Sequence, residues 1–443
     1  MAAVTRRTLF RGAMAAAGLA VGVGPAALLG GCGGTSPARG AGALNLTLLG
    51  QAVGSPAADL TPLASALADA YNAAGGVAAR VRPQAAEPSL AAYMESLLLG
   101  APPVPADLML TPPAVRNLLS APSMMVSLDA ALERTGLAGG IYDMVLQYCA
   151  PGGRQRMIPI FRDPLVVFYN VDAFSGAGVD PPAPTWTSDR LLWLCGQLLA
   201  RPRGPVAPLA NAVNTFDIEV FTAFVAGYGG RMLSPNANAH VPGFLPRFAE
   251  PQAIEGIDAL LRLHPYEPPR PEAPPLALFA RGDAAMCFGH HSDVRFLQAQ
   301  IADLFAWGVA PLPRFPQRAA QPVRAEGIAA ITRDPANREA AVAVALFAAT
   351  ADGQLAAART GLGVPASKAL ASSGLWRQGA PHLDNDVFVA NAQADIVLEP
   401  ALYYIQPELE EALRAALAGA PVATIFGEAS TAVEFTLQTW SNA

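Results

Sequence analysis

The residues whose types and spacing most clearly permit chemistry lie near the start of the chain, at Cys32. Two glycines stand directly before this cysteine, and they end an uncharged run of small and apolar residues, 12–31. Small side chains leave the backbone open to a peptidase, and the thiol can then take a lipid. Arg6, Arg7 and Arg11 give the segment a positive start. The order of charge, apolar run and cysteine is typical of an export signal.

We therefore predict that residues 1–31 are a lipoprotein signal peptide and that Cys32 is lipidated. The Arg-Arg pair with Leu9 and Phe10 after it resembles a twin-arginine signal, which implies export of an already folded chain. The alternative is a retained membrane-spanning helix, but the run is weakly hydrophobic and contains Pro25. A lipidated Cys32 would tether the rest of the chain outside the cytoplasmic membrane through a flexible segment, 32–43.

The remaining cysteines and histidines do not have the spacing of a metal or redox site. The sequence contains no CxxC, HExxH or GxSxG motif. Cys149, Cys195 and Cys287 are odd in number, widely separated and set among apolar residues. We expect these three to be small buried hydrophobic residues, and we expect no metal and no cofactor.

Length and charge narrow the class of protein. A chain of 443 residues has room for two domains of ordinary size. The net charge is only -6, and the sequence shows no basic patch of the size that nucleic acid needs. No long apolar run follows Cys32, so the lipid is the only membrane attachment that we expect.

Beyond the tether, strand-like and helix-like patterns alternate, which favours α/β architecture with mostly parallel sheets covered by helices. Strands are expected at 44–48, 79–82, 106–110, 156–160, 165–169, 284–288, 306–310 and 327–331. Helices are expected over 60–71 and 89–99, with further starts at Thr187 or Ser188, Pro251, Pro335 and Pro407 and stops at Gly361 and Gly419.

Several segments together resemble bacterial extracellular solute-binding proteins of the maltose-binding type. Residues 157–186 (MIPIFRDPLVVFYNVDAFSGAGVDPPAPTW) resemble the family's strand that crosses between lobes. Residues 277–294 (ALFARGDAAMCFGHHSDV) resemble its F-x-x-G-x-A-A-M motif. WGVAPLPRF at 307–315 with GIAAI at 327–331, and the Gly-Gly hairpin of FVAGYGGRML at 224–233, follow in matching order.

The resemblance implies a two-lobe periplasmic-binding-protein-like fold with a ligand cleft and a hinge between the lobes. By analogy the first lobe is 44–162 plus 309–368, and the second is 163–308 plus 369–443. A carbohydrate or polyol would bridge the cleft and favour the closed form, which would dock on ABC permease subunits in the membrane. Such a protein is a monomeric, extracytoplasmic binding protein and needs no catalytic residue.

Five candidate ligand residues lie where the resemblance places the crossover and the cleft. Arg162 and Asp163 stand at the crossover, where they either pair with each other or hold ligand hydroxyls. His290 and His291 replace the family's Pro-Trp after the A-A-M strand, so they either bind hydroxyls or an anion, or merely cap the next turn. Glu326 precedes a strand in the loop facing the hinge and is a weaker candidate.

Four more candidates follow from strand ends and aromatic character. Gln51 follows the first strand and Thr111 follows the third, and ligands of α/β sheets bind at such carboxyl ends. Their alternative role is as turn residues or helix caps. Tyr403 and Tyr404 match an aromatic pair that the family directs at its cleft, where an aromatic ring can stack on a sugar face.

Other functions stay open at this point. Arg162 and the two histidines would also suit a glycerol-phosphate-type polyol. The protein could serve a sensor instead of a permease. An exported glycoside hydrolase is a weaker alternative, because carboxylates such as Asp163 and Glu326 could pair.

Overall fold

The structure is a computed structural model of the chain. It describes residues 43–48, 60–74, 80–85, 107–111, 125–150, 153–200, 207–236, 243–269, 272–331, 334–377, 383–390, 392, 395–397, 402 and 405–441. Cys32 and Gln51, the predicted helix at 89–99, and Tyr403 and Tyr404 lie outside these residues.

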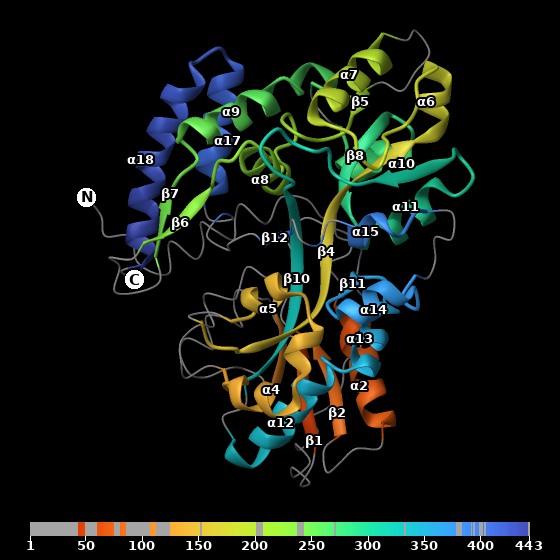
Figure 1. The fold of residues 1–443 in the computed structure, drawn as a ribbon, viewed down its shortest axis with the longest axis vertical. Helices are drawn as coiled ribbons and strands as arrows, with labels where there is room; N and C mark the ends of the chain where they lie inside the picture. Colours follow the sequence, from red (N-terminus) through yellow and green to blue (C-terminus); the bar gives the residue numbers. More distant parts are fainter. Residues whose placement is uncertain are drawn as a thin grey trace, which may run out of the picture.

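The described chain forms two α/β bodies, one below the other in Figure 1, with long strands running between them. The lower body carries β1 (Ala43–Leu48), β2 (Arg80–Ala85) and β3 (Leu108–Thr111). The upper body carries β5 (Ala207–Leu209) and β8 (Ala284–His290). This arrangement is the predicted two-lobe class of fold.

Two strands connect the bodies, β4 (Met157–Asn170) and β10 (Gln321–Ala330). They lie side by side in one large sheet of order β2-β1-β3-β10-β4-β8-β5, to which β9 (Trp307–Ala310), β11 (Val364–Pro365) and β12 (Asp395–Val397) add at β4 and β10. Two separate strands were predicted at 156–160 and 165–169, but they form the single strand β4. Arg162, Asp163 and Pro164 stay extended and pair with β10.

The expectation of a mostly parallel sheet is wrong for the middle of this sheet. β1 is parallel to β2 and β3, and β5 is parallel to β8. However, β10 is antiparallel to β3 and β4, and β4 is antiparallel to β8, β9 and β11. The chain leaves the lower body along β4 and returns along β10, so two neighbouring crossing strands must run in opposite directions.

Helices cover both bodies. In the lower body these are α2 (Thr61–Ala73), α4 (Asp129–Thr135), α5 (Asp143–Tyr148), α12 (Pro335–Phe347) and α13 (Ala351–Ala358). In the upper body they are α6 (Val171–Ala177), α7 (Ser188–Leu199), α8 (Ile218–Gly227), α9 (Pro251–Leu261), α10 (Pro275–Ala280), α11 (Val294–Ile301), α17 (Gln406–Leu417) and α18 (Val422–Ser441). α15 (Val387–Ala390) lies beside β4, and α14 (Lys368–Ser373) lies beside β11. The hairpin of β6 (Leu233–Asn236) and β7 (Gly243–Pro246) packs on α18.

The predicted helix starts are confirmed. α7, α9, α12 and α17 each begin at or within one residue of the predicted position. The hydroxyl of Thr187 accepts a hydrogen bond from the backbone N–H of Arg190 and caps α7. Proline stands in the first turn of α9 and α17, where its missing N–H costs no helical hydrogen bond. Gly419 follows α17 with a φ of 99°, as predicted for a stop.

Apolar side chains form three clusters. The lower core includes Leu63, Leu110 and Ile158, and the upper core includes Val167 and Phe221. The third cluster includes Phe168 and Phe279 of the upper body and extends to Val364 of β11 and Ala358 of α13. The three cysteines of the described chain are buried and unbridged, as predicted. Each body can therefore bury its own apolar residues, with β4 and β10 as shared elements.

Among the described residues, no single helix has the length and apolar character to cross a membrane, although the bent pair Asn337–Phe347 and Ala351–Ala358 meets those criteria together.

Candidate functional site

The crossing strands β4 and β10 carry polar side chains on both of their faces. Residues that stand opposite each other in an antiparallel pair point to the same side, and successive residues alternate. Arg324 pairs with Asp163, and Ala325 pairs with Arg162. Asp163 and Arg324 therefore share one face of the sheet, while Arg162 lies on the other.

One face, which we call the acidic face, comprises Asp163, Glu219, His290, Arg324 and Glu326. The Glu219 carboxylate joins two cations there. Its Oε1 accepts a hydrogen bond from Nε of Arg324 at 2.8 Å, and its Oε2 lies 2.5 Å from Nε2 of His290. The Glu219 side chain is only 1% exposed, whereas that of Arg324 is 28% exposed. Glu219 thus holds a buried histidine and a partly accessible arginine together.

Local structure places each member of this network. Asp217 caps α8 by accepting hydrogen bonds from the backbone N–H groups of Glu219 and Val220, which sets Glu219 in the first turn. His290 ends β8, and its own N–H donates to Oδ2 of Asp293 at 2.8 Å. A Cβ on Gly289 would come within 2.9 Å of the Phe168 ring and 3.0 Å of that carboxylate, so only glycine permits this close approach.

His290 is held as a cation by the groups around its ring. Its Nδ1 faces the carbonyl oxygen of Asp163 at 3.1 Å, and its Nε2 faces the Glu219 carboxylate. Both partners can only accept hydrogen bonds, so both ring nitrogens carry a proton. Burial and Arg324 act to lower the pKa of His290, but Glu219 outweighs them, with a smaller contribution from Asp163, and the pKa rises to about 9.

The same charges act on Glu219 in the opposite sense. Burial acts to raise the pKa of this carboxyl, but Arg324 and His290 outweigh burial and hold the pKa well below its usual range. Glu219 is therefore ionised near pH 7.

Glu326 differs from the other acids of this face. The residue is 5% exposed, and its Oε2 is buried without a hydrogen-bond partner. Burial, together with the carboxylate of Asp163, raises the pKa of Glu326 well above its usual range, although Arg324 acts to lower it. The register of the pairing between β10 and β4 also shifts between Glu326 and Gly327. Such a shift marks a β-bulge, and β-bulges are common beside functional sites.

The opposite face, which we call the aromatic face, comprises Tyr142, Arg162, His291, Trp376 and Phe388. The fully buried Arg162 donates from Nη1 to the carbonyl oxygen of Phe388 at 2.6 Å, and its guanidinium lies over the Tyr142 ring. The His291 ring makes edge contacts with Trp376 and Phe388, at centroid distances of 5.3 and 4.8 Å. Burial lowers the pKa of His291 to about 4, so the ring is neutral near pH 7.

The structure separates two pairs that stand together in the sequence. His290 belongs to the acidic face and His291 to the aromatic face. Arg162 and Asp163 are separated in the same way, and none of the ion pairs between described residues joins them. The predicted option of an Arg162–Asp163 salt bridge is wrong, because neighbouring residues of a strand point to opposite faces.

Thr111 lies at the carboxyl end of β3, where it pairs with Gly327 of β10. Gly327 directly follows Glu326 on β10, so the backbone of Thr111 lies close to that of Glu326. The ligand roles of Gln51, Tyr403 and Tyr404 stay predictions.

Sequence reasoning did not identify Glu219, Arg324 or Glu267. Glu219 is the one charged residue in the apolar helix Ile218–Gly227, and that pattern was available as a signal of a paired, buried charge. Glu267 accepts hydrogen bonds from the N–H groups of Ala212, Val213 and Asn214, and fixes the loop after β5. Burial raises the pKa of Glu267 to about 7, although these donors act to lower it.

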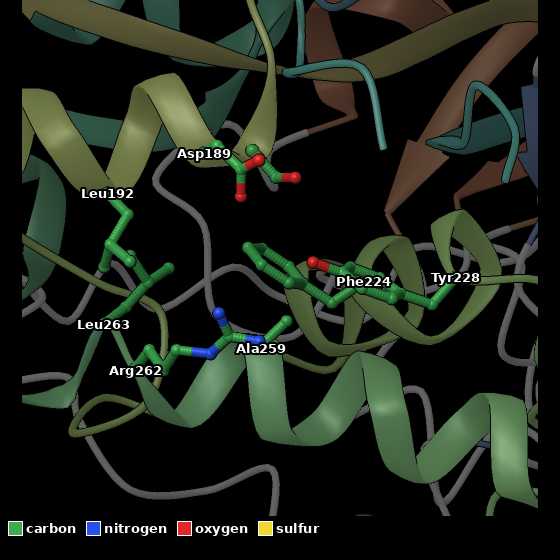
Figure 2. A pocket seen from close by; sticks show the side chains of 8 residues that line it. Asp189, Leu192, Phe224, Tyr228, Ala259, Arg262 and Leu263 are labelled. Carbon is green, nitrogen blue, oxygen red and sulfur yellow. The ribbon is translucent and has the colours of Figure 1, made fainter. Parts of the chain in front are cut away.

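No group of three or more His, Cys, Asp or Glu in the described ranges is arranged to hold a metal ion. A small depression lies between α7, α8 and α9, away from the crossing strands. Figure 2 shows Asp189 above Phe224 and Arg262 below it. It has room for about one water molecule. The acidic face is therefore the stronger candidate for a ligand site.

Comparisons with known proteins agree with this architecture. A structure of the cyclic α-maltosyl-1,6-maltose binding protein from Arthrobacter globiformis has a TM-score of 0.72 at 16% identity, covering 91% of this chain and 100% of that one. An ABC substrate-binding protein from Listeria monocytogenes in complex with cycloalternan has a TM-score of 0.70 at 15% identity, covering 90% and 100%. UgpB from Mycobacterium tuberculosis in complex with glycerophosphocholine has a TM-score of 0.69 at 16% identity, covering 90% and 98%.

At these identities the structures establish a shared fold alone. No curated protein matches the chain. Residues 57–355 match the family described as bacterial extracellular solute-binding protein, which is more than half of the sequence. The chain belongs to the family of bacterial extracellular solute-binding proteins.

Proposed function

We propose that the chain is the lipid-anchored binding protein of an ABC importer and that it binds a carbohydrate between its two lobes. The observation that carries this proposal is the pair of strands β4 and β10, which join two separately packed bodies and carry a polar network where they cross. Closure about such a crossing would enclose the ligand and present one fixed shape to the permease.

The proposed lobes are 44–162 plus 309–368 and 163–308 plus 369–443. Packing supports the proposed boundary between residues 162 and 163, since Phe161 belongs to the lower core and Leu165 to the upper core. Leu312 and Phe315 also pack in the upper core, which favours placing the return crossing within β10 instead of at 309.

A neutral carbohydrate fits the described residues better than a phosphate-containing polyol. Similar folds include proteins solved with cycloalternan and with glycerophosphocholine, so the fold admits both classes. The cations that favoured phosphate are already engaged, because Arg162 is fully buried against Phe388 and His290 pairs with Glu219.

The first experiment is a thermal-shift screen of the chain from Cys32 onward. The panel comprises maltose, maltotriose, trehalose, cycloalternan and glycerophosphocholine. A ligand that binds only the folded protein, at 100 times its Kd, adds about 2.7 kcal/mol and raises the midpoint by roughly 3–6 °C. We expect a shift with at least one neutral sugar and an unchanged sugar after incubation. Absence of any sugar shift would refute the carbohydrate proposal, and consumption of the sugar would indicate a hydrolase.

The lipid anchor has its own test. In a bacterial host with a lipoprotein pathway, the full chain is expected to incorporate radiolabelled palmitate and to fractionate with membranes. Cys32→Ala should abolish the label, and Cys149→Ala, at a buried cysteine, serves as the matched control. Equal labelling of wild type and Cys32→Ala would show that Cys32 is not the lipid site.

A further inference from the structure

We propose that Glu267 is a positioning residue of the ligand site, and that its carboxylate is the anion that holds the loop between β5 and α8 beside the acidic face. The inference rests on the proposed carbohydrate-binding function. It adds a residue that would not touch the sugar, yet would set how tightly the sugar binds.

The hold on the loop is the first observation. The two carboxylate oxygens of Glu267 accept hydrogen bonds from the backbone N–H groups of Ala212, Val213 and Asn214, at 2.9, 2.7 and 3.1 Å. Successive N–H groups that converge on one point form a nest, which is an anion-binding arrangement of the backbone. Glu267 is 5% exposed, so water competes little for these bonds. The anion of this nest is therefore part of the chain itself.

The position of Glu267 is set by its own backbone. Glu267 follows a 3₁₀ turn, η5 (His264–Tyr266), and precedes Pro268, and a proline disfavours helical backbone at the residue before it. The backbone of Glu267 is accordingly extended, with φ −104° and ψ 159°. The side chain of Asn214 also donates to the carbonyl oxygen of Pro268 at 3.1 Å, so this segment holds the loop at two points.

The course of the loop is the second observation. β5 and β8 are parallel, so the loop leaves β5 at the edge of the sheet where β8 ends with His290. At the start of the loop, the Asn211 side chain bonds both the N–H and the carbonyl oxygen of Phe288. At its end, Asp217 caps α8, whose first turn carries Glu219 opposite His290. A displaced loop would therefore move Glu219 and change the shape of the acidic face.

A free carboxylate should be able to replace the Glu267 side chain. Glu267→Ala removes a methylene and a carboxylate, which together match the heavy atoms of acetate. Acetate can thus occupy the vacated nest, whereas acetamide has the same shape without the charge. Hydrogen bonds to an ionised acceptor are roughly twice as strong as those to a neutral one, so acetamide should replace the side chain poorly.

The test uses isothermal titration calorimetry at pH 8 on the chain from Cys32 onward, with maltose, maltotriose and trehalose as probes. Glu267, with a pKa of about 7, is mostly ionised at this pH. For the sugar that binds, Glu267→Ala is expected to weaken affinity about tenfold, because the loop must then be ordered on binding. Sodium acetate should restore affinity to within about threefold of wild type, while acetamide and sodium chloride at the same concentration should not. Glu250→Ala, at an exposed site, is the matched control and should bind as wild type does with or without acetate.

A second variant keeps the test decisive if Glu267→Ala does not fold. Glu267→Gln keeps the size of the side chain, but its amide nitrogen cannot accept a hydrogen bond from the loop. It should weaken sugar affinity about threefold or more, and the amides of Ala212, Val213 and Asn214 should exchange hydrogen faster than in wild type.

Three outcomes would contradict the inference. A folded variant at Glu267 that binds the sugar as tightly as wild type would overturn the positioning role and leave the carbohydrate function intact. Acetate that restores the affinity of Glu267→Ala no better than acetamide would overturn the nest. Binding of no sugar by the wild-type protein would overturn the proposed function and the positioning role with it.

Discussion

Replacement of Glu219 with alanine is expected to lower the free energy of unfolding by about 3–5 kcal/mol. The carboxylate is 1% exposed and faces both His290 and Arg324. Its removal leaves the imidazolium of His290 buried without a counterion, and a buried unpaired charge is among the most costly defects in a protein interior. Neutralisation of His290 would relieve part of this cost, so the loss should be larger at pH 6 than at pH 8.

The measurement is urea unfolding followed by circular dichroism, with the same analysis applied to a surface ion pair. Arg247 and Glu250 lie 3.4 Å apart with side chains 38% and 36% exposed. Glu250→Ala should cost less than about 1 kcal/mol, because water screens an exposed pair. Similar losses for Glu219→Ala and Glu250→Ala would show that the acidic face does not depend on a buried ion pair.

The second large effect is a loss of stability as pH rises from about 6.5 to 9. His290 has a raised pKa of about 9 in the folded protein, against about 6.5 in an unfolded chain. A group with a raised folded pKa stabilises fully below its unfolded pKa, and that contribution disappears as pH rises through the folded value. The difference corresponds to a loss on the order of 3 kcal/mol across this window.

A His290→Gln variant isolates this contribution. The difference in unfolding free energy between wild type and His290→Gln should shrink steadily from pH 6.5 to 9. Glu267, with a pKa raised to about 7, also loses stabilisation as pH rises, but it does so mainly below this window and equally in both proteins. A difference that stays constant over these pH values would mean that His290 is neutral in the folded protein.

The local elements were largely predictable because their signals are local. The cap at Thr187, the prolines at the starts of α9 and α17, and the glycine after α17 act within a few residues, so their effect on the chain is visible in the sequence. The single strand β4 was harder to predict. Arg162, Asp163 and Pro164 look like an interruption, yet pairing with β10 keeps them extended.

The composition of the candidate site was only partly predictable. Asp163, His290 and Glu326 were identified and do share one face, but Arg162 and His291 belong to the other. The Glu219–Arg324 contact joins residues 105 positions apart, and no local pattern links α8 to β10. Only the apolar surroundings of Glu219 hinted that its charge would need a partner.

The sequence by itself therefore determined the α/β class and the positions of most strands and helices, because hydrophobic period and capping act over short distances. That a strand within 157–186 crosses between lobes followed only from the family resemblance. The tertiary structure decided which charges meet, since strand pairing assigns each side chain to one face of the sheet and brings distant elements against it. A shift of one residue in the pairing of β4 would exchange the two faces and place Arg162, instead of Asp163, on the acidic face.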